Sequence, residues 1–306
     1  MGTRSRIAKL LAVTLAAVAV ASMSACGSAE PGDGGPTIVA AFYPLQFAAE
    51  RVGGERVRVV GLTQPGAEPH DLELSPRQVG EISDATLMVY LHGFQPAVDA
   101  AVEQAGVTAL DAASLVPLIE ATADDEHVGA DAPAGADPHV WLDPTRLATI
   151  ADAVATRLGE LDPEGAAGYQ DRAEALRTEL SALDAEYADG LRSCERREIV
   201  VSHAAFGYLA DRYDLRQIPI TGLSPDTEPT PGQLAVTAEE AREVGATTIF
   251  FETLVSPAVA EAVADAVGAQ TAVLDPIEGL EPGATGDYVS VMRANLATLR
   301  SALGCS

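Results

Sequence analysis

Residues 162–192 read DPEGAAGYQDRAEALRTELSALDAEYADGLR and lie near the middle of a 306-residue chain. The apolar side chains of this stretch recur every three or four residues, which is the spacing of one buried face of an α-helix. They are Tyr169, Ala173, Leu176, Leu180, Leu183, Tyr187 and Leu191. At 1.5 Å per residue the helix would be roughly 45 Å long. The pattern therefore predicts a rigid helix that can run along two lobes and join them.

Short apolar runs alternate with amphipathic stretches on both sides of this helix. Four of the runs precede it and four follow it: Thr37–Ala41, Val57–Leu62, Leu87–Leu91, Val107–Leu110, Glu198–Ser202, Gln217–Thr221, Thr248–Phe251 and Thr271–Leu274. Strands that alternate with helices indicate parallel sheets that are covered on both faces. We therefore expect an α/β protein with an N-terminal lobe at 37–143, a helical segment at 144–194 and a C-terminal lobe at 195–306.

Several predicted helices begin with a capping residue that is followed by proline, as at Ser75-Pro76 and Thr230-Pro231. Proline suits the first helical position because its missing N–H would have no partner there. Gln78 and Gln233 lie three residues after these two caps. This spacing predicts a capping box at the start of both helices.

The first 25 residues have the features of an export signal. Met1–Lys9 is short and basic, and the 12 residues of Leu10–Ala21 are almost entirely apolar. Because a transmembrane helix needs about 20 apolar residues, this shorter run predicts a signal peptide at 1–25. The ending Ser24-Ala25-Cys26-Gly27 resembles a bacterial lipobox, in which Cys26 is lipidated and becomes the first residue. Secretion with an unmodified Cys26 is the alternative. The Gly- and Pro-rich residues 26–36 predict a flexible tether.

The composition excludes several classes of function. Hydrophobic residues make up 47% of the chain and charged residues 21%, which is typical of a globular protein. A formal charge of −26 would repel a phosphate backbone, so nucleic acid is excluded as a partner. The only lysine is Lys9, which lies in the export signal. The mature protein therefore has no lysine for a Schiff base or for a phosphate-binding loop.

Two cysteines remain after the lipobox, Cys194 and Cys305. An even pair in an exported protein favours a structural disulfide, which would fix the C-terminal tail. Two unpaired thiols are the alternative. The spacing does not match a CxxC motif, so a redox or zinc–cysteine site is disfavoured.

Three of the five histidines lie next to the ends of predicted elements. His70 follows the second strand, His139 precedes a helix, and His203 follows the strand at 198–202; Asp275 likewise follows the last strand. Ligands of open α/β sheets bind beyond the carboxyl ends of the strands, so we expect these four groups where the two lobes face each other. Three imidazoles and one carboxylate suit tetrahedral Zn²⁺. From the residues alone, hydrogen-bonded structural histidines are an equally good interpretation.

Four segments occur in the order PGAEPHDLELSP (65–76), DPHVWLDP (137–144), VVSHAAFGYLA (200–210) and VLDPIEGL (273–280). Together they resemble the metal-specific solute-binding proteins of ABC importers, the ZnuA/TroA-like family, and the resemblance extends from Thr37 to Leu303. It implies two α/β lobes joined by a long helix, with one metal ion in the cleft. It also implies the ligands His70, His139, His203 and Asp275, a permease in the membrane as partner, and a lipid anchor at Cys26.

Other residues near the expected cleft have alternative interpretations. Zinc members of the family often have a His-rich loop before the second ligand, whereas Glu120–Asp137 is acidic with the single His127, which favours a solvated loop over a metal-gathering one. His92 is either a direct or transient ligand or a residue of the loop. Glu68 either adds an oxygen ligand or shapes its turn. Glu252 is a candidate for orienting a histidine ligand through a hydrogen bond.

The sequence thus predicts an extracytoplasmic, lipid-anchored and monomeric receptor that captures Zn²⁺ for an ABC permease and catalyses no reaction. The alternatives are a Mn²⁺ or Fe²⁺ receptor of the same family, a surface adhesin on this scaffold, and a zinc hydrolase. Manganese members of the family tend to have a carboxylate where this chain has His203, which favours zinc. Catalytic zinc keeps one position open for water, so four protein ligands disfavour the hydrolase.

Overall fold

A computed structural model describes residues 35–120 and 135–306. Each lobe is built on a four-stranded parallel sheet. The N-terminal sheet has the order β2-β1-β3-β4 and the C-terminal sheet the order β6-β5-β7-β8. The strands are β1 (Thr37–Ala40), β2 (Arg58–Gly61), β3 (Leu87–Tyr90), β4 (Ala109–Asp111), β5 (Glu198–Val201), β6 (Arg216–Pro219), β7 (Thr248–Phe251) and β8 (Gln270–Val273). All eight predicted strands are therefore present, with ends within two residues of those expected.

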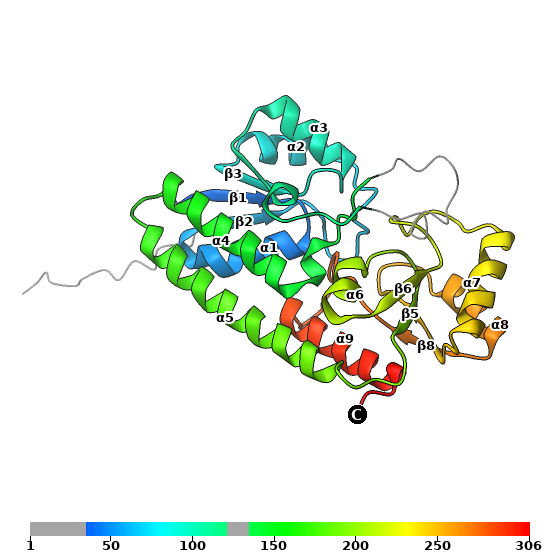
Figure 1. Ribbon diagram of the computed structural model, residues 1–306. Helices are drawn as coiled ribbons and strands as arrows, with labels where there is room; N and C mark the ends of the chain where they lie inside the picture. The colour runs from blue at the N-terminus through cyan, green and yellow to red at the C-terminus, as the bar shows by residue number, and fades with distance from the viewer. Residues whose placement is uncertain (1–34, 121–134) are drawn as a thin grey trace, which may run out of the picture.

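Helices connect the strands and pack on both lobes (Figure 1). They are α1 (Tyr43–Gly53), α2 (Pro76–Ser83), α3 (Pro96–Ala105), α4 (Pro144–Leu161), α5 (Ala166–Gly190), α6 (Gly207–Tyr213), α7 (Pro231–Glu243), α8 (Ala258–Val267) and α9 (Tyr288–Leu303), with short 3₁₀ helices η1 (Gly54–Arg56), η2 (Ala112–Leu115) and η3 (Val140–Leu142). The predicted capping boxes at Ser75 and Thr230 are both formed. None of the helices in the described ranges combines the length and apolar character needed to span a bilayer.

The long helix α5 has 25 residues, and its predicted stripe is buried along its whole length. The helix packs on α4 and α1 in the N-terminal lobe and on α9 in the C-terminal lobe (Figure 1). Polar contacts fix both ends of this arrangement. The Nε of Arg172 donates to the carbonyl oxygen of Val52 at 2.6 Å, and the hydroxyl of Tyr187 donates to the carbonyl oxygen of Met292 at 2.6 Å. The helix therefore joins the two lobes, as the sequence predicts.

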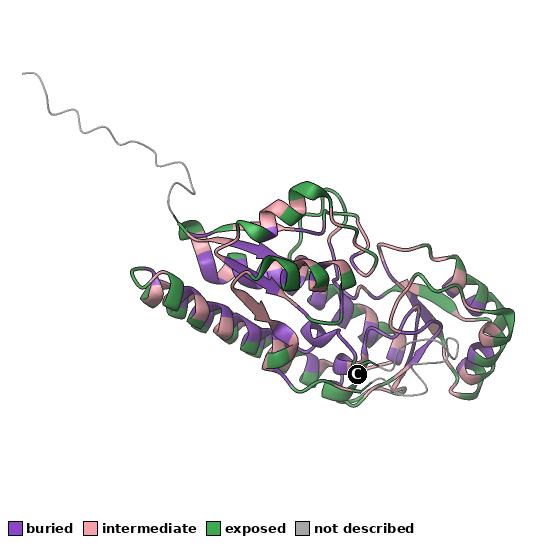
Figure 2. Ribbon diagram, turned by 90° about the horizontal axis from the view of Figure 1, so that it is seen from above, coloured by how far each residue is buried: buried purple, intermediate pink, exposed green. Residues whose placement is uncertain are grey.

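A single hydrophobic core extends from the N-terminal sheet through α4 and α5 into the C-terminal lobe, and a smaller core lies beneath α7 and α8. Figure 2 shows the central strands buried inside their covering helices. Trp141 and Tyr288 are fully buried members of the larger core, and the Tyr288 hydroxyl donates to the carbonyl oxygen of Trp141. The apolar interior is thus continuous from one lobe to the other.

The structure joins Cys194, which lies before β5, to Cys305, which follows α9, in a disulfide. This bond connects the last residues of the chain to the start of the C-terminal sheet. The export signal, the proposed lipidation site Cys26 and His127 of the acidic loop lie outside the described residues.

Candidate metal site

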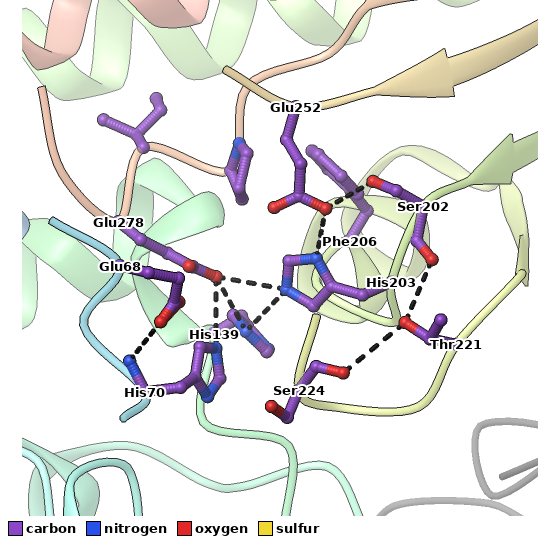
Figure 3. Close-up of polar contacts among 12 residues, drawn as sticks. Glu68, His70, His139, Ser202, His203, Phe206, Thr221, Ser224, Glu252 and Glu278 are labelled. Carbon is purple, nitrogen blue, oxygen red and sulfur yellow. Dashed lines mark hydrogen bonds and ion pairs between the residues drawn. The ribbon is translucent and has the colours of Figure 1, made fainter. Parts of the chain in front are cut away.

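Four side chains from distant parts of the chain meet between the lobes: His70, His139, His203 and Glu278 (Figure 3). Each offers one ligand atom, and these atoms all lie within 4.8 Å of one another. His70 comes from the loop between β2 and α2, and His139 immediately precedes η3. His203 follows β5, and Glu278 lies in the segment between β8 and α9. The site is therefore assembled where parallel strands end, which is where open α/β sheets bind ligands.

The Glu278 carboxylate lies at the centre of the cluster. Its Oε1 is 3.4 Å from Nε2 of His70, 3.2 Å from Nε2 of His139 and 3.1 Å from Nε2 of His203. The side chains of His139 and His203 are fully buried, and those of His70 and Glu278 are only 9% and 2% exposed. All three imidazoles thus point Nε2 at one small, buried volume.

Two further carboxylates contact the Nδ1 atoms of the buried imidazoles, on the side of each ring away from Glu278. The Nδ1 of His139 donates to Oδ1 of Asp137 at 2.8 Å, and the Nδ1 of His203 donates to Oε1 of Glu252 at 2.6 Å. Because an ionised carboxylate only accepts hydrogen bonds, each contact places the proton on Nδ1 and leaves the lone pair of Nε2 for a metal. The Glu252 carboxylate also accepts a hydrogen bond from the Ser202 hydroxyl (Figure 3). The sequence signalled a role of this kind for Glu252 but not for Asp137, although Asp137 stands only two residues before its histidine.

Aromatic rings form one wall of the site. The Phe94 ring lies 4.5 Å from that of His70, and the Trp141 ring lies 5.3 Å from that of His139, both measured between centroids. Both aromatic side chains are buried. An apolar wall limits the access of water and strengthens electrostatic interactions inside the site.

Burial and neighbouring charges shift the pKa values of the cluster residues in opposite directions. Burial lowers the pKa of His70. Burial also disfavours the charged form of His203, but Glu252 and Glu278 outweigh it and raise the pKa of His203 well above its ordinary value. Burial would raise the pKa of Glu278, yet the charges of His70 and His203 hold it well below its usual range. The site thus favours an anionic Glu278 beside a protonated His203, an ion pair inside a buried volume.

The sequence placed Asp275 in the fourth position, and the structure places Glu278 there instead. The Asp275 carboxylate accepts hydrogen bonds from the backbone N–H of Ile277 at 2.7 Å and from the Thr253 hydroxyl at 3.0 Å. Burial raises the pKa of Asp275 to about 6. Asp275 is the first acid after β8, which is why the strand-end rule selected it. The segment turns at Ile277, however, and that turn brings the next acid, Glu278, to the histidines.

The two other candidate side chains have different surroundings. Oε2 of Glu68 accepts a hydrogen bond from the backbone N–H of His70 at 2.8 Å, while its Oε1 is buried without a hydrogen-bond partner. Burial and, to a lesser extent, the charge of Glu278 raise the pKa of Glu68 to about 9. Glu68 therefore shapes the turn before His70. The side chain of His92 is 68% exposed, with its Nδ1 at 3.4 Å from Oδ2 of Asp99, and it lies outside the cluster.

The chain is similar to several known zinc-binding and zinc-uptake proteins. The family model described as the zinc-uptake complex component A, periplasmic (ZnuA), matches residues 38–302. The zinc-binding lipoprotein AdcA of Streptococcus pneumoniae is 32% identical over 303 residues, covering 95% of this chain and 60% of its own length. The high-affinity zinc uptake system protein ZnuA of Bacillus subtilis is 30% identical over 306 residues, covering 96% of both chains.

Among solved structures, the laminin binding protein of Streptococcus agalactiae superposes with a TM-score of 0.79. It is 32% identical and covers 88% of this chain and 100% of its own. That protein is described as bifunctional, with adhesin and metal transporting activity. This chain thus spans the whole of some relatives and about 60% of the pneumococcal lipoprotein.

Proposed function

The chain belongs to the ZnuA family of zinc-uptake components, and from this premise we propose that it captures Zn²⁺ outside the cytoplasm and delivers it to an ABC permease. The observation that carries the proposal is the buried convergence of three imidazole Nε2 atoms on one carboxylate. Zn²⁺ takes four nitrogen, sulfur or oxygen ligands in a tetrahedron, and this set offers four.

The proposed ligands are His70, His139, His203 and Glu278. Oε1 of the Glu278 carboxylate lies 3.1–3.4 Å from Nε2 of each of the three histidines, where it accepts hydrogen bonds from protonated imidazole nitrogens. A histidine binds metal only in its neutral form, so Zn²⁺ takes the place of these protons and releases them. Asp137 and Glu252 keep each buried ring in the orientation and tautomer that a metal needs.

Zinc is the metal that this set of ligands favours. Imidazole nitrogen suits Zn²⁺, whereas Mn²⁺ lies lowest in the affinity order and prefers sites rich in oxygen. Four protein groups also leave no position for the water that a catalytic zinc activates, which argues against the hydrolase. Adhesion is described for the laminin-binding relative. The buried group of three histidines and one glutamate in this chain favours a role in metal transport.

Delivery requires that the protein stays near the membrane. We propose that lipidation of Cys26 supplies the anchor and that residues 27–36 supply the tether. The receptor would act as a monomer, because one chain provides all four ligands. The high negative charge of the chain would favour the approach of divalent cations.

Metal analysis of the purified protein tests the proposal. Equilibrium dialysis against Zn²⁺ and a tenfold excess of Mn²⁺ should load one zinc per chain. The His203→Glu variant should have a smaller preference for Zn²⁺ over Mn²⁺, because the substitution replaces an imidazole nitrogen with carboxylate oxygen. The His92→Ala variant should bind zinc as the wild type does, since His92 lies outside the cluster. A wild-type protein that emerges loaded with manganese would overturn the zinc assignment and leave a metal receptor.

A further inference from the structure

The segment that carries Glu278 contains a residue in an unusual backbone conformation. Ile277 has a φ of 58° and is fully buried. Left-handed backbone is strongly disfavoured for a β-branched residue, so the surrounding structure must hold it there. Ile277 directly precedes Glu278, and its conformation therefore decides the direction in which the Glu278 side chain leaves the backbone.

Asp275 supplies the contact that holds this turn. Its Oδ1 accepts a hydrogen bond from the backbone N–H of Ile277 at 2.7 Å, and its Oδ2 accepts one from the Thr253 hydroxyl at 3.0 Å. The side-chain amide of Asn295, in α9, bonds the backbone of Asp275 on both sides. The N–H of Asp275 donates to Oδ1 of Asn295 at 3.0 Å, and Nδ2 of Asn295 donates to the carbonyl oxygen of Asp275 at 2.7 Å. Asn295 is only 3% exposed.

The N-terminal lobe fixes the same segment on either side of Glu278. Nε1 of Trp141 donates to the carbonyl oxygen of Pro276 at 2.7 Å. The backbone N–H of Gly66, in the loop that carries His70, donates to the carbonyl oxygen of Leu280 at 2.8 Å. Because hydrogen bonds fix the backbone at Pro276 and at Leu280, the direction of the Glu278 side chain depends on the turn between these two residues.

We propose that Asp275 is a positioning residue that holds Ile277 in its left-handed conformation and thereby aims the Glu278 carboxylate at the three histidines. The inference rests on the proposed zinc function and assigns a role to an acid that does not itself reach the cluster. The contacts through which Asp275 would act are its hydrogen bonds with the Ile277 backbone N–H and the Thr253 hydroxyl.

Zinc affinity of Asp275 variants of the mature protein tests this role. Asp275→Ala removes the acceptor for the Ile277 N–H, so zinc affinity should fall by about 10- to 100-fold, as is typical for a residue that orients a ligand. Asp275→Asn keeps an oxygen at the same place and should restore most of the lost affinity. In the Asp275→Ala background, Ile277→Gly should recover part of it as well, since glycine adopts positive φ at no steric cost.

A double-mutant cycle shows whether the effect passes through Glu278. In a Glu278→Ala background there is no carboxylate to aim, so adding Asp275→Ala should change zinc affinity less than twofold. The visible spectrum of bound Co²⁺ should report the same loss of a ligand in Asp275→Ala as in Glu278→Ala. Asp287→Ala is the matched control. Asp287 caps α9 in the same lobe, and its loss should lower thermal stability without changing zinc affinity.

Three results would overturn the proposal. They are an Asp275→Ala protein with wild-type affinity, an Asp275→Asn protein as impaired as Asp275→Ala, and an Asp275→Ala effect of undiminished size in the Glu278→Ala background. All three presuppose a wild type that binds zinc. A wild type that fails to bind zinc would refute the proposed function itself, so the two failures are distinguishable.

Discussion

In the N-terminal lobe the strand order is β2-β1-β3-β4, and in the C-terminal lobe it is β6-β5-β7-β8, so β1 corresponds to β5 and β2 to β6. The proposed ligands do not follow this correspondence. His203 stands two residues after β5, whereas the N-terminal lobe presents His70 from the loop after β2. Two lobes of the same topology thus present their histidines to one cluster from different positions in the sheet.

The support behind the buried histidines differs in the same way. His139 is held by Asp137, two residues earlier in the chain. His203 is held by Glu252, which follows the neighbouring strand β7 and is 49 residues away in sequence. One half of the site is therefore fixed by a local turn, and the other half depends on the correct pairing of two strands.

The largest expected effect comes from removing one ligand from each lobe. His139→Ala and His203→Ala should each lower zinc affinity by more than the 10- to 100-fold that is typical of an orienting residue, because each deletes one of four coordination positions. Calorimetric titration measures both, with His127→Ala as the control that should bind normally. Near wild-type affinity in either variant would remove that histidine from the proposed set of ligands.

Removal of the disulfide should destabilise the C-terminal lobe more than the N-terminal lobe. The Cys194–Cys305 bond joins residues 111 apart within the C-terminal half, and losing such a bond costs about 2–4 kcal/mol. Hydrogen exchange in the Cys194→Ser/Cys305→Ser protein should therefore quicken in β5–β8 more than in β1–β4. Equal acceleration in both sheets would show that the lobes unfold as one cooperative unit.

The two orienting carboxylates provide a finer comparison. Asp137→Asn and Glu252→Gln should each reduce zinc affinity by about 10- to 100-fold. Glu252→Gln should cost more zinc affinity, because Glu252 reaches His203 across two paired strands, whereas Asp137 is also held beside His139 by the backbone N–H of that residue. Competition with a zinc chelator of known affinity ranks the two variants. A larger loss of zinc affinity in Asp137→Asn would show that the local contact supports the site more than the long-range one does.

The smallest expected effect concerns the contact of α5 with the C-terminal lobe. The guanidinium of Arg212 donates to Asp184 at 2.8 Å and holds the pKa of that carboxyl below its ordinary value. A lowered pKa adds stability that is present above the unfolded pKa of about 3.9 and is lost as the pH falls through the folded pKa. Arg212→Met should therefore lower the unfolding free energy at pH 7 by about 1 kcal/mol or less, and by less still at pH 3. Urea titrations at both pH values measure the difference, and a larger loss at pH 3 would contradict it.

Much of the fold follows from short-range signals in the sequence. The strands are short apolar runs with clear boundaries, and α5 carries one unbroken stripe, so local patterns suffice for both. The positions of His70, His139 and His203 next to predicted elements made them candidates, and the resemblance to the ZnuA/TroA-like family implied them as ligands. Glu278 was not found, because the choice between it and Asp275 depends on the backbone of Ile277, and an isoleucine gives no sequence signal for a positive φ.

The continuous core that α5 shares with both lobes limits how the molecule can move. Domains swing freely when the surface between them is small and polar, whereas here Trp141, Tyr187 and Tyr288 are buried where the halves join. A clam-like hinge would have to open this apolar contact to water. We expect the two lobes to keep nearly the same relative orientation with and without bound metal. An ion would then enter and leave by the displacement of the loops that carry His70 and Glu278. A transporter that distinguishes loaded from empty receptors would then have to sense those loops and not the angle between the lobes.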